Sequence, residues 1–192
     1  MPYNQLFSLI SSLPMLNMQE KPQITAEGFL DAAAVWLQGN ELAELKELSL
    51  SPKTENHFRA GSFAAVYSAW ELALRHSILR LRIQKNRYTD VPAADIPVFE
   101  CDADAVAIRA YGAGDPLERE YILDRARWEK TEELTVGQTF GTDPLQAYFI
   151  RLQIAWKWAK RSMGNPEKNL DAAAENPEKG DNNNDENKQK HI

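Results

Sequence analysis

One long stretch of helical periodicity, residues 57–86, constrains the fold of this chain more than any other feature. Apolar residues recur in it at i, i+3, i+4 and i+7, which places their side chains on one face of an α-helix. A chain of 192 residues with a hydrophobic content of 43% is long enough to bury such a face in a core. We therefore expect an all-α fold, a multi-helix bundle. The periodic face comprises Phe63, Val66, Tyr67, Trp70, Leu74, Ile78 and Leu81.

Two further stretches begin with the same three residues, Asp-Pro-Leu, at positions 115 and 143. An Asp at the N-cap accepts a hydrogen bond from a free backbone amide, and a Pro that follows has no amide to leave unpaired. We predict helices from 115 to about 134 and from 143 to about 163. Capping chemistry alone explains the shared opening. The two long helices, 57–86 and 143–163, also align loosely at Tyr67 and Tyr148, as an internal duplication would.

Capping signals predict three shorter helices. Thr25 begins one that runs to about Leu37, Asn40 begins a second, and Asp102 begins a third that ends near Tyr111. The apolar residues 3–16 fit a short helix or an extended segment equally well. After Gly164 the chain has almost no large apolar residue and repeats "NPEK", so we expect one helical domain, 1–163, and a disordered, acidic and Asn-rich tail, 164–192.

The composition argues against several functional classes. A net charge of −6 argues against general nucleic-acid binding, and no apolar run reaches the roughly 20 residues of a membrane helix. The N-terminus lacks the basic region of a signal peptide, and a lone Cys101 suits a reducing compartment. Three histidines without metal-ligand spacing, and no phosphate-binding loop, GxSxG or HExxH, predict neither metal nor cofactor. We expect a soluble, cytoplasmic, non-enzymatic protein that reaches a membrane only through a partner.

A pair of acids on the helix that begins at 115 is the strongest candidate for chemistry. Asp124 falls within the apolar stripe of Leu117, Tyr121 and Trp128, and Glu120 lies one turn before it. An acid on an apolar face is costly unless it is paired. It is either a catalytic or metal-binding carboxylate, or a structural buried acid held by an Arg or by helix amides of a neighbouring element. Since no second acidic or His motif converges on it, we favour the structural interpretation.

Both long helices are apolar on a second side, which predicts either a second layer of helices or a surface for a partner. The second half of the central helix, "RHSILRLRIQKNR", contains five cations and no acid. Asp124 is a candidate partner for one of its arginines. The remaining cations of this helix predict a basic patch that docks an acidic protein. The candidate partner-binding residues are Arg75, Arg80, Arg82, Lys85, Arg87, Leu72, Leu79, Ile83, Ile150, Ile154 and Trp158.

The order of these pieces resembles a small uncharacterised bacterial family whose members are encoded among the subunits of V/A-type rotary ATPases. The similarity covers most of residues 3–163. It is carried by Leu13-Pro14 after the apolar N-terminus, by Phe29 and Trp36, and by the segments "ALRHSILRLR" and "PLEREYILD".

A second similarity is to the all-helical C subunit of these ATPases, which is named d in eukaryotes. Its Glu-x-x-Leu-Asp pattern matches residues 120–124, and its following helix, with a Tyr and a basic end, is similar to the helix with Tyr148 and Lys160-Arg161. The chain is too short for the three helical units of a full-length C subunit. The resemblance implies a shortened, non-catalytic counterpart that packs against other ATPase subunits. The alternatives are a helical enzyme with a carboxylate site around Glu120 and Asp124, and a free-standing helical adaptor for an acidic ligand.

Overall fold

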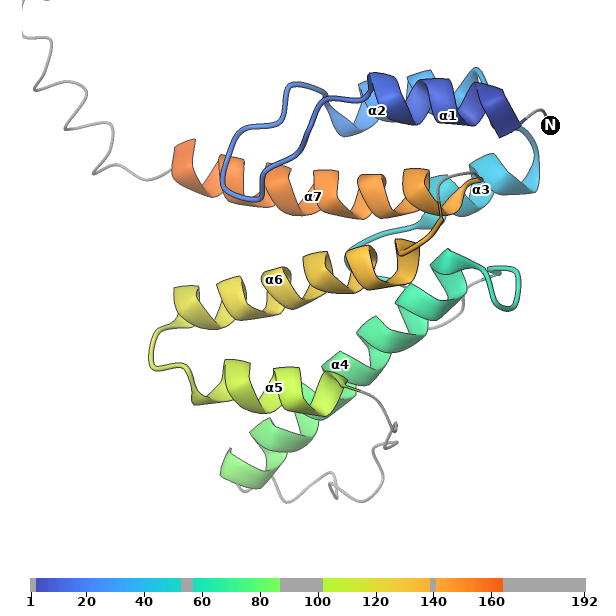
Figure 1. Cartoon of the computed structure of the whole chain (residues 1–192). Coiled ribbons are helices and arrows are strands. Elements are labelled where there is room, and N and C mark those ends of the chain that lie inside the picture. Colours follow the sequence, from blue (N-terminus) through green and yellow to red (C-terminus); the bar gives the residue numbers. More distant parts are fainter. Residues whose placement is uncertain (1–2, 53–56, 87–101, 139–140, 164–192) are drawn as a thin grey trace, which may run out of the picture.

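The computed structural model describes residues 3–52, 57–86, 102–138 and 141–163, and all regular secondary structure among them is helical (Figure 1). The prediction of an all-α bundle is therefore confirmed. None of the described helices combines the length and hydropathy needed to cross a bilayer. The helices are α1 (Tyr3–Ser12), α2 (Ala26–Ala34), α3 (Asn40–Glu47), α4 (Phe63–Asn86), α5 (Ala103–Gly112), α6 (Pro116–Thr135) and α7 (Asp143–Met163).

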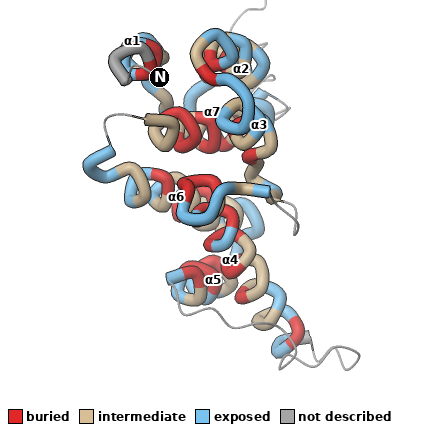
Figure 2. Tube along the Cα trace, turned by 90° about the vertical axis from the view of Figure 1, so that its right-hand side faces the viewer, coloured by how far each residue is buried: buried red, intermediate tan, exposed pale blue. Residues whose placement is uncertain are grey.

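Helix α7 lies in the interior of the bundle. Figure 1 shows α1 and α2 on one side of α7 and α6 on the other, with α3 beside the first turns of α7, α5 beyond α6 and α4 crossing the α6 side obliquely. Helix α4 packs against α5, α6 and α7, and α2 packs against α7. Buried residues concentrate along α7 and where α6 meets α4, as Figure 2 shows.

Two groups of buried side chains form the core. The larger surrounds α7, where the completely buried Phe29 of α2 stacks on Tyr148 and Phe149 with ring centroids 5.3 and 5.4 Å apart. The smaller lies between α4, α5 and α6 and includes Trp70 and Leu74. The bundle is therefore held by one apolar cluster around α7 and a second between α4, α5 and α6.

Local capping chemistry explains the starts of α2 and α6. The Thr25 hydroxyl accepts a hydrogen bond from the Gly28 amide at 3.0 Å, and the Asp115 carboxylate accepts one from the Glu118 amide at 3.2 Å. Pro116 is the first residue of α6, as the Asp-Pro-Leu pattern predicts. The observed α7, Asp143–Met163, also has the predicted bounds. Met163 is the last described residue, and the predicted disordered tail, 164–192, lies outside the described residues, so the predicted domain boundary stays a prediction.

Two predicted starts and one predicted side-chain cap need correction. Helix α4 begins at Phe63 rather than near 57, because Gly61 has a φ of 77°, in the left-handed region. The N-cap of α3 is Gly39, without a side-chain cap, and Asn40 is already helical. Asp102 is the N-cap of α5, but its carboxylate accepts a hydrogen bond from the Trp70 indole at 2.7 Å and does not cap the helix.

The second apolar side of α7 is core and not a partner surface, which corrects part of the sequence-based interpretation. Ile150 and Ile154 are completely buried, because helices cover α7 on both sides. Trp158 is half-buried, and its ring meets Tyr121 edge-on at 5.7 Å. On α4, Ile83 is also buried. Leu72 is half-buried and Leu79 is exposed, so of these apolar candidates only Leu79 offers a large accessible side chain.

Candidate functional site

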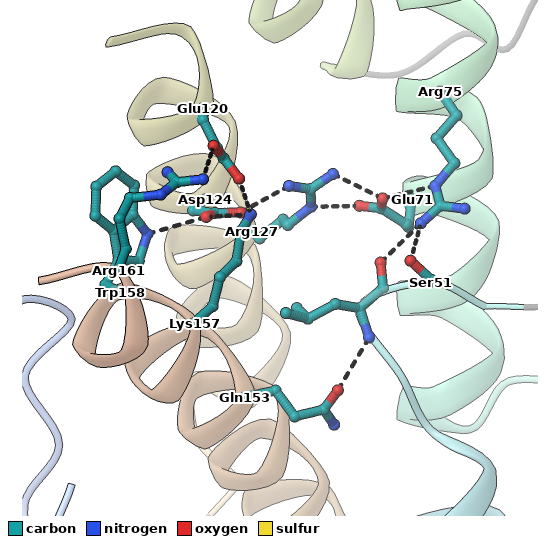
Figure 3. A network of polar contacts seen from close by, with 11 residues as sticks. Ser51, Glu71, Arg75, Glu120, Asp124, Arg127, Gln153, Lys157, Trp158 and Arg161 are labelled. Atoms are coloured by element: carbon teal, nitrogen blue, oxygen red, sulfur yellow. Dashed lines mark hydrogen bonds and ion pairs between the residues drawn. The ribbon is translucent and has the colours of Figure 1, made fainter. Parts of the chain in front are cut away.

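Asp124 is completely buried in the middle of α6, where donors from two helices surround its carboxylate (Figure 3). Its Oδ1 accepts a hydrogen bond from Arg127 at 2.7 Å. Its Oδ2 accepts from the Lys157 ammonium at 2.7 Å and from the Trp158 indole at 2.9 Å. This buried acid therefore has both oxygens occupied, by one donor from its own helix and two from α7.

Glu71 of α4 is a second completely buried carboxylate. Arg127 donates to both of its oxygens, from Nη2 to Oε1 at 2.8 Å and from Nε to Oε2 at 2.9 Å. Arg75 donates to Oε1 at 2.9 Å. The planar guanidinium of Arg127 thus joins Glu71 to Asp124, and with it α4 to α6.

The electrostatics of Arg127 follow from this position. Burial by itself lowers the pKa of Arg127, but the hydrogen bonds and charge of Glu71, with the charge of Asp124, outweigh it and raise the pKa overall. Arg127 is therefore a permanent cation between two buried acids. Removing either Glu71 or Asp124 leaves the buried positive charge of Arg127 with only one of its two neutralising acids.

Glu120 extends the network to the surface. Lys157 lies 2.7 Å from its Oε1, and Arg161 lies 2.5 Å from its Oε2. Partial burial by itself raises the pKa of Glu120, but the hydrogen bonds and charges of Lys157 and Arg161 outweigh it and lower the pKa. Lys157 therefore holds Glu120 and Asp124 together, while Arg161 also lies over the Trp158 ring at 5.2 Å.

The opposite end of the network fixes the chain that follows α3. Arg75 donates to the Leu50 carbonyl at 2.8 Å and to the Ser51 hydroxyl at 3.1 Å. Gln153 of α7 accepts from the Leu50 amide at 3.2 Å and donates to the Leu48 carbonyl at the same distance. The network therefore ties together the segment after α3 and helices α4, α6 and α7.

These contacts define what the acids can do chemically. A general base or metal ligand needs an oxygen directed at its substrate or ion, whereas both oxygens of Glu71, Asp124 and Glu120 accept from cations or N–H groups of this chain. No group of three His, Cys, Asp or Glu side chains suited to a metal ion occurs among the described residues. The geometry is that of an internal network which joins helices.

Sequence reasoning missed most of this network. Glu71 falls on the apolar face of the central helix between Trp70 and Leu74, the same signal that singled out Asp124. Arg127 and Lys157 gave no such signal, because their role depends on how the helices pack. The prediction that an arginine of α4 pairs with Asp124 is wrong, since Arg127 of α6 takes that position.

The cations of α4 divide into two groups. Arg75 pairs with Glu71, and Arg80 pairs with Asp104 of α5 at 2.6 Å. Arg82 and Lys85 are exposed, and no described acid forms an ion pair with either. Arg87 lies outside the described residues.

The exposed cations lie beside an exposed apolar side chain. Leu79, which is 44% exposed, precedes Arg82 by three positions and so lies next to it on the helix. The Lys85 ammonium lies 5.1 Å from the centre of the Tyr111 ring, a cation–π contact that holds it against α5. We call Leu79, Arg82 and Lys85 the basic surface of α4.

Comparison of the chain with protein-family models, with curated proteins and with solved structures gives no match. The function must therefore be inferred from the internal network and from the surfaces that the fold presents.

Proposed function

We propose that this chain is a non-catalytic helical adaptor that holds an acidic partner against the basic surface of α4. The observation that carries the proposal is the division of cations along one helix. Arg75 and Arg80 neutralise acids of the chain itself, whereas Arg82 and Lys85 stay at the surface beside Leu79. An apolar anchor flanked by cations is a common composition for a protein–protein contact.

The overall charge favours an acidic partner with a defined orientation. The chain carries a net charge of −6, so its overall charge does not attract an acidic protein. The basic surface of α4 is an exception, and it directs such a partner to one end of the bundle. Solvent and salt screen exposed charges, so Arg82 and Lys85 add little to the affinity for the partner. They contribute mainly to the association rate and to the register in which the partner binds.

The saturated network supports a non-catalytic role. Glu120 and Asp124, the acids on which an enzyme of this chain would depend, are held by Lys157, Arg161 and Arg127. Such a network stabilises one arrangement of the helices, which suits a rigid adaptor. Guided by the family resemblance, we propose that the partner belongs to a V/A-type rotary ATPase, with the chain acting as a shortened counterpart of its C subunit. Contact with the membrane would then be indirect, through the complex.

The test is co-purification of ATPase subunits with the tagged full chain, identified by mass spectrometry. The variant is Arg82→Glu with Lys85→Glu. Its matched control is Lys46→Glu with Lys160→Glu, which changes the net charge equally at exposed positions on α3 and α7. Arg80 is left unchanged, because its ion pair with Asp104 joins α4 to α5.

We expect the native chain and the control to retain ATPase subunits, and the α4 variant to lose them, with the largest difference at low salt. Undiminished co-purification of the α4 variant would refute the docking surface. If the native chain retains an acidic protein from outside the ATPase, the adaptor role stands and the ATPase assignment is wrong.

A further inference from the structure

A groove of about 470 Å³ lies between the chain that links α1 to α2 and the outer face of α6. This volume is within the range of about 300–1,000 Å³ that is typical of binding sites. Its lining residues come from two segments that are far apart in the sequence. They are Met15, Leu16, Asn17, Met18 and Gln19 on one side, and Tyr121, Arg125, Trp128, Glu129 and Glu132 on the other.

The wall formed by residues 15–19 is held in place by hydrogen bonds. The Tyr148 hydroxyl donates to the Pro14 carbonyl at 2.9 Å, and burial raises the pKa of Tyr148 to about 12, so the hydroxyl stays protonated as a donor. Asn17 donates to Glu20 at 2.8 Å and accepts from the Gln19 amide at 3.1 Å, which closes a tight turn. This wall is therefore shaped before any partner binds.

The α6 wall presents two aromatic rings in fixed orientations. The Trp128 indole donates to Glu132 at 3.0 Å, and Arg151 lies 5.7 Å from the centre of its ring. Tyr121 meets the Trp158 ring edge-on. Rings fixed in this way lose little conformational freedom on binding, which is typical of good interface anchors.

The groove also contains apolar surface that no described residue covers. Met15 is 97% exposed, the highest exposure among the large hydrophobic side chains that the structure describes. Leu16 and Met18 beside it are partly buried against the core. Methionine is flexible and polarisable, and methionine-rich grooves adapt to the apolar faces of helices.

The charges around the groove are predominantly acidic. Arg125 is the one cation among its lining residues, and it pairs with Glu129 at 2.8 Å. Glu132 accepts from the Trp128 indole, and Glu20, at the groove edge, accepts from the Asn17 amide. Neither Glu20 nor Glu132 forms a close ion pair with a described residue, although burial lowers the pKa of Arg151 beside the Trp128 ring and the charge of Glu132 offsets part of this effect. The groove thus combines apolar side chains with one such acid on the α6 wall, Glu132, and another, Glu20, next to the lining residue Gln19.

From this combination we propose that the groove docks an amphipathic helix of a partner protein, with bulky apolar side chains on one face and Lys or Arg beside them. The apolar face lies on Met15, Tyr121 and Trp128, and the basic side chains meet Glu20 and Glu132. This surface differs in position and charge from the basic surface of α4. The chain would join two partners of opposite charge, and the groove would bind its helix whether or not the ATPase assignment holds.

The probe is a fluorescein-labelled designed peptide of Leu and Lys with helical amphipathic spacing, titrated against the full chain and followed by fluorescence anisotropy. Two peptides serve as controls, one with Glu in place of Lys and one with the Leu/Lys sequence scrambled. The groove variants are Met15→Ser and Glu132→Gln, whose amide oxygen still accepts the indole N–H. Matched controls are Val35→Ser, at another exposed apolar residue, and Glu133→Gln, which removes the same charge from α6 outside the groove.

We expect the Leu/Lys peptide to bind the groove and both control peptides to bind the groove much more weakly, so that Met15→Ser changes the affinity of the Leu/Lys peptide alone. Met15→Ser should weaken binding about tenfold, the effect of losing much of one buried side chain. Glu132→Gln should weaken it in a salt-dependent way, whereas the matched variants should not. Binding of the Leu/Glu peptide that Met15→Ser weakens as much as it weakens binding of the Leu/Lys peptide, or unchanged affinity of the Leu/Lys peptide in both groove variants, refutes the proposal. A dimer of the native chain that Met15→Ser dissociates in analytical ultracentrifugation would also refute it, because a second copy would then fill the groove.

Discussion

Replacing Asp124 with Ala removes the acid at the centre of the internal network. The change leaves Arg127, Lys157 and Trp158 without a shared acceptor in the interior. We expect a large loss of stability, because the remaining charges keep their desolvation cost while their attraction to Asp124 is lost.

The size of the stability loss depends on which other contacts Arg127, Lys157 and Trp158 keep. Removing one partner of a buried pair typically costs about 3–5 kcal/mol. Arg127, 12% exposed, keeps its two bonds to Glu71, and Lys157, 33% exposed, keeps Glu120, so solvent and the second acid compensate part of the loss. The Trp158 indole loses its acceptor, which costs about 1 kcal/mol. We therefore expect Asp124→Ala to lower the free energy of unfolding by about 3 kcal/mol, near the low end of the range.

Urea unfolding of the full chain, followed by circular dichroism, measures this loss. With a slope of about 2 kcal/mol per molar urea, the midpoint should fall by about 1.5 M. Glu129→Ala is the control, since it removes an acid from the same helix whose ion pair with Arg125 is exposed on both sides. Its midpoint should hardly move.

A midpoint shift of less than about 0.5 M for Asp124→Ala, with an unchanged slope, would refute the stability argument. A variant that unfolds like the native chain but loses a measurable catalytic activity would favour the enzyme alternative.

Two further predictions concern titration and an unpaired hydroxyl. Because the fold lowers the pKa of Glu120 below its ordinary 4.5, its ionised form contributes stability at higher pH that is lost as pH falls through the lowered value. Glu120→Gln should therefore flatten the decrease in melting temperature between about pH 5 and pH 3, and an unchanged decrease would contradict this. The Tyr67 hydroxyl is buried without a hydrogen-bond partner among the described residues, and burial, followed by the charge of Glu71, raises its pKa. Tyr67→Phe should leave the urea midpoint unchanged or raise stability by about 1 kcal/mol, and a lower midpoint would reveal a hidden partner.

Local chemistry explains why much of the fold is predictable from the sequence. The caps at Thr25 and Asp115 involve groups three positions apart, so the sequence contains both donor and acceptor. The carboxylate of Asp102 does not cap α5, because it accepts a hydrogen bond from the indole of Trp70, which is 32 positions away. A tertiary contact of that kind has no local signature.

The same distinction applies to the sites. A buried acid is predictable at Asp124 because an acid within an apolar stripe can be recognised from helical spacing in the sequence alone. Which cation approaches it depends on how α6 and α7 pack. The second apolar side of α7 is ambiguous for the same reason, since helical spacing shows that a face is apolar but not whether a helix or a partner covers it.

The position of α7 has a consequence for synthesis of the chain. The bonds from Tyr148 to Pro14 and from Trp156 to Ile24 span 134 and 132 positions. Phe29, and the α1–α3 layer around it, therefore leave the ribosome long before the helix that they pack against. At a translation rate of roughly 5–20 residues per second, their apolar faces stay without this partner helix for on the order of ten seconds. By contrast, α4, α5 and α6 meet as soon as they are made, so this half can collapse first and the N-terminal layer closes last. The first three helices are therefore the part of the nascent chain that a chaperone would have to shield until translation has passed residue 163.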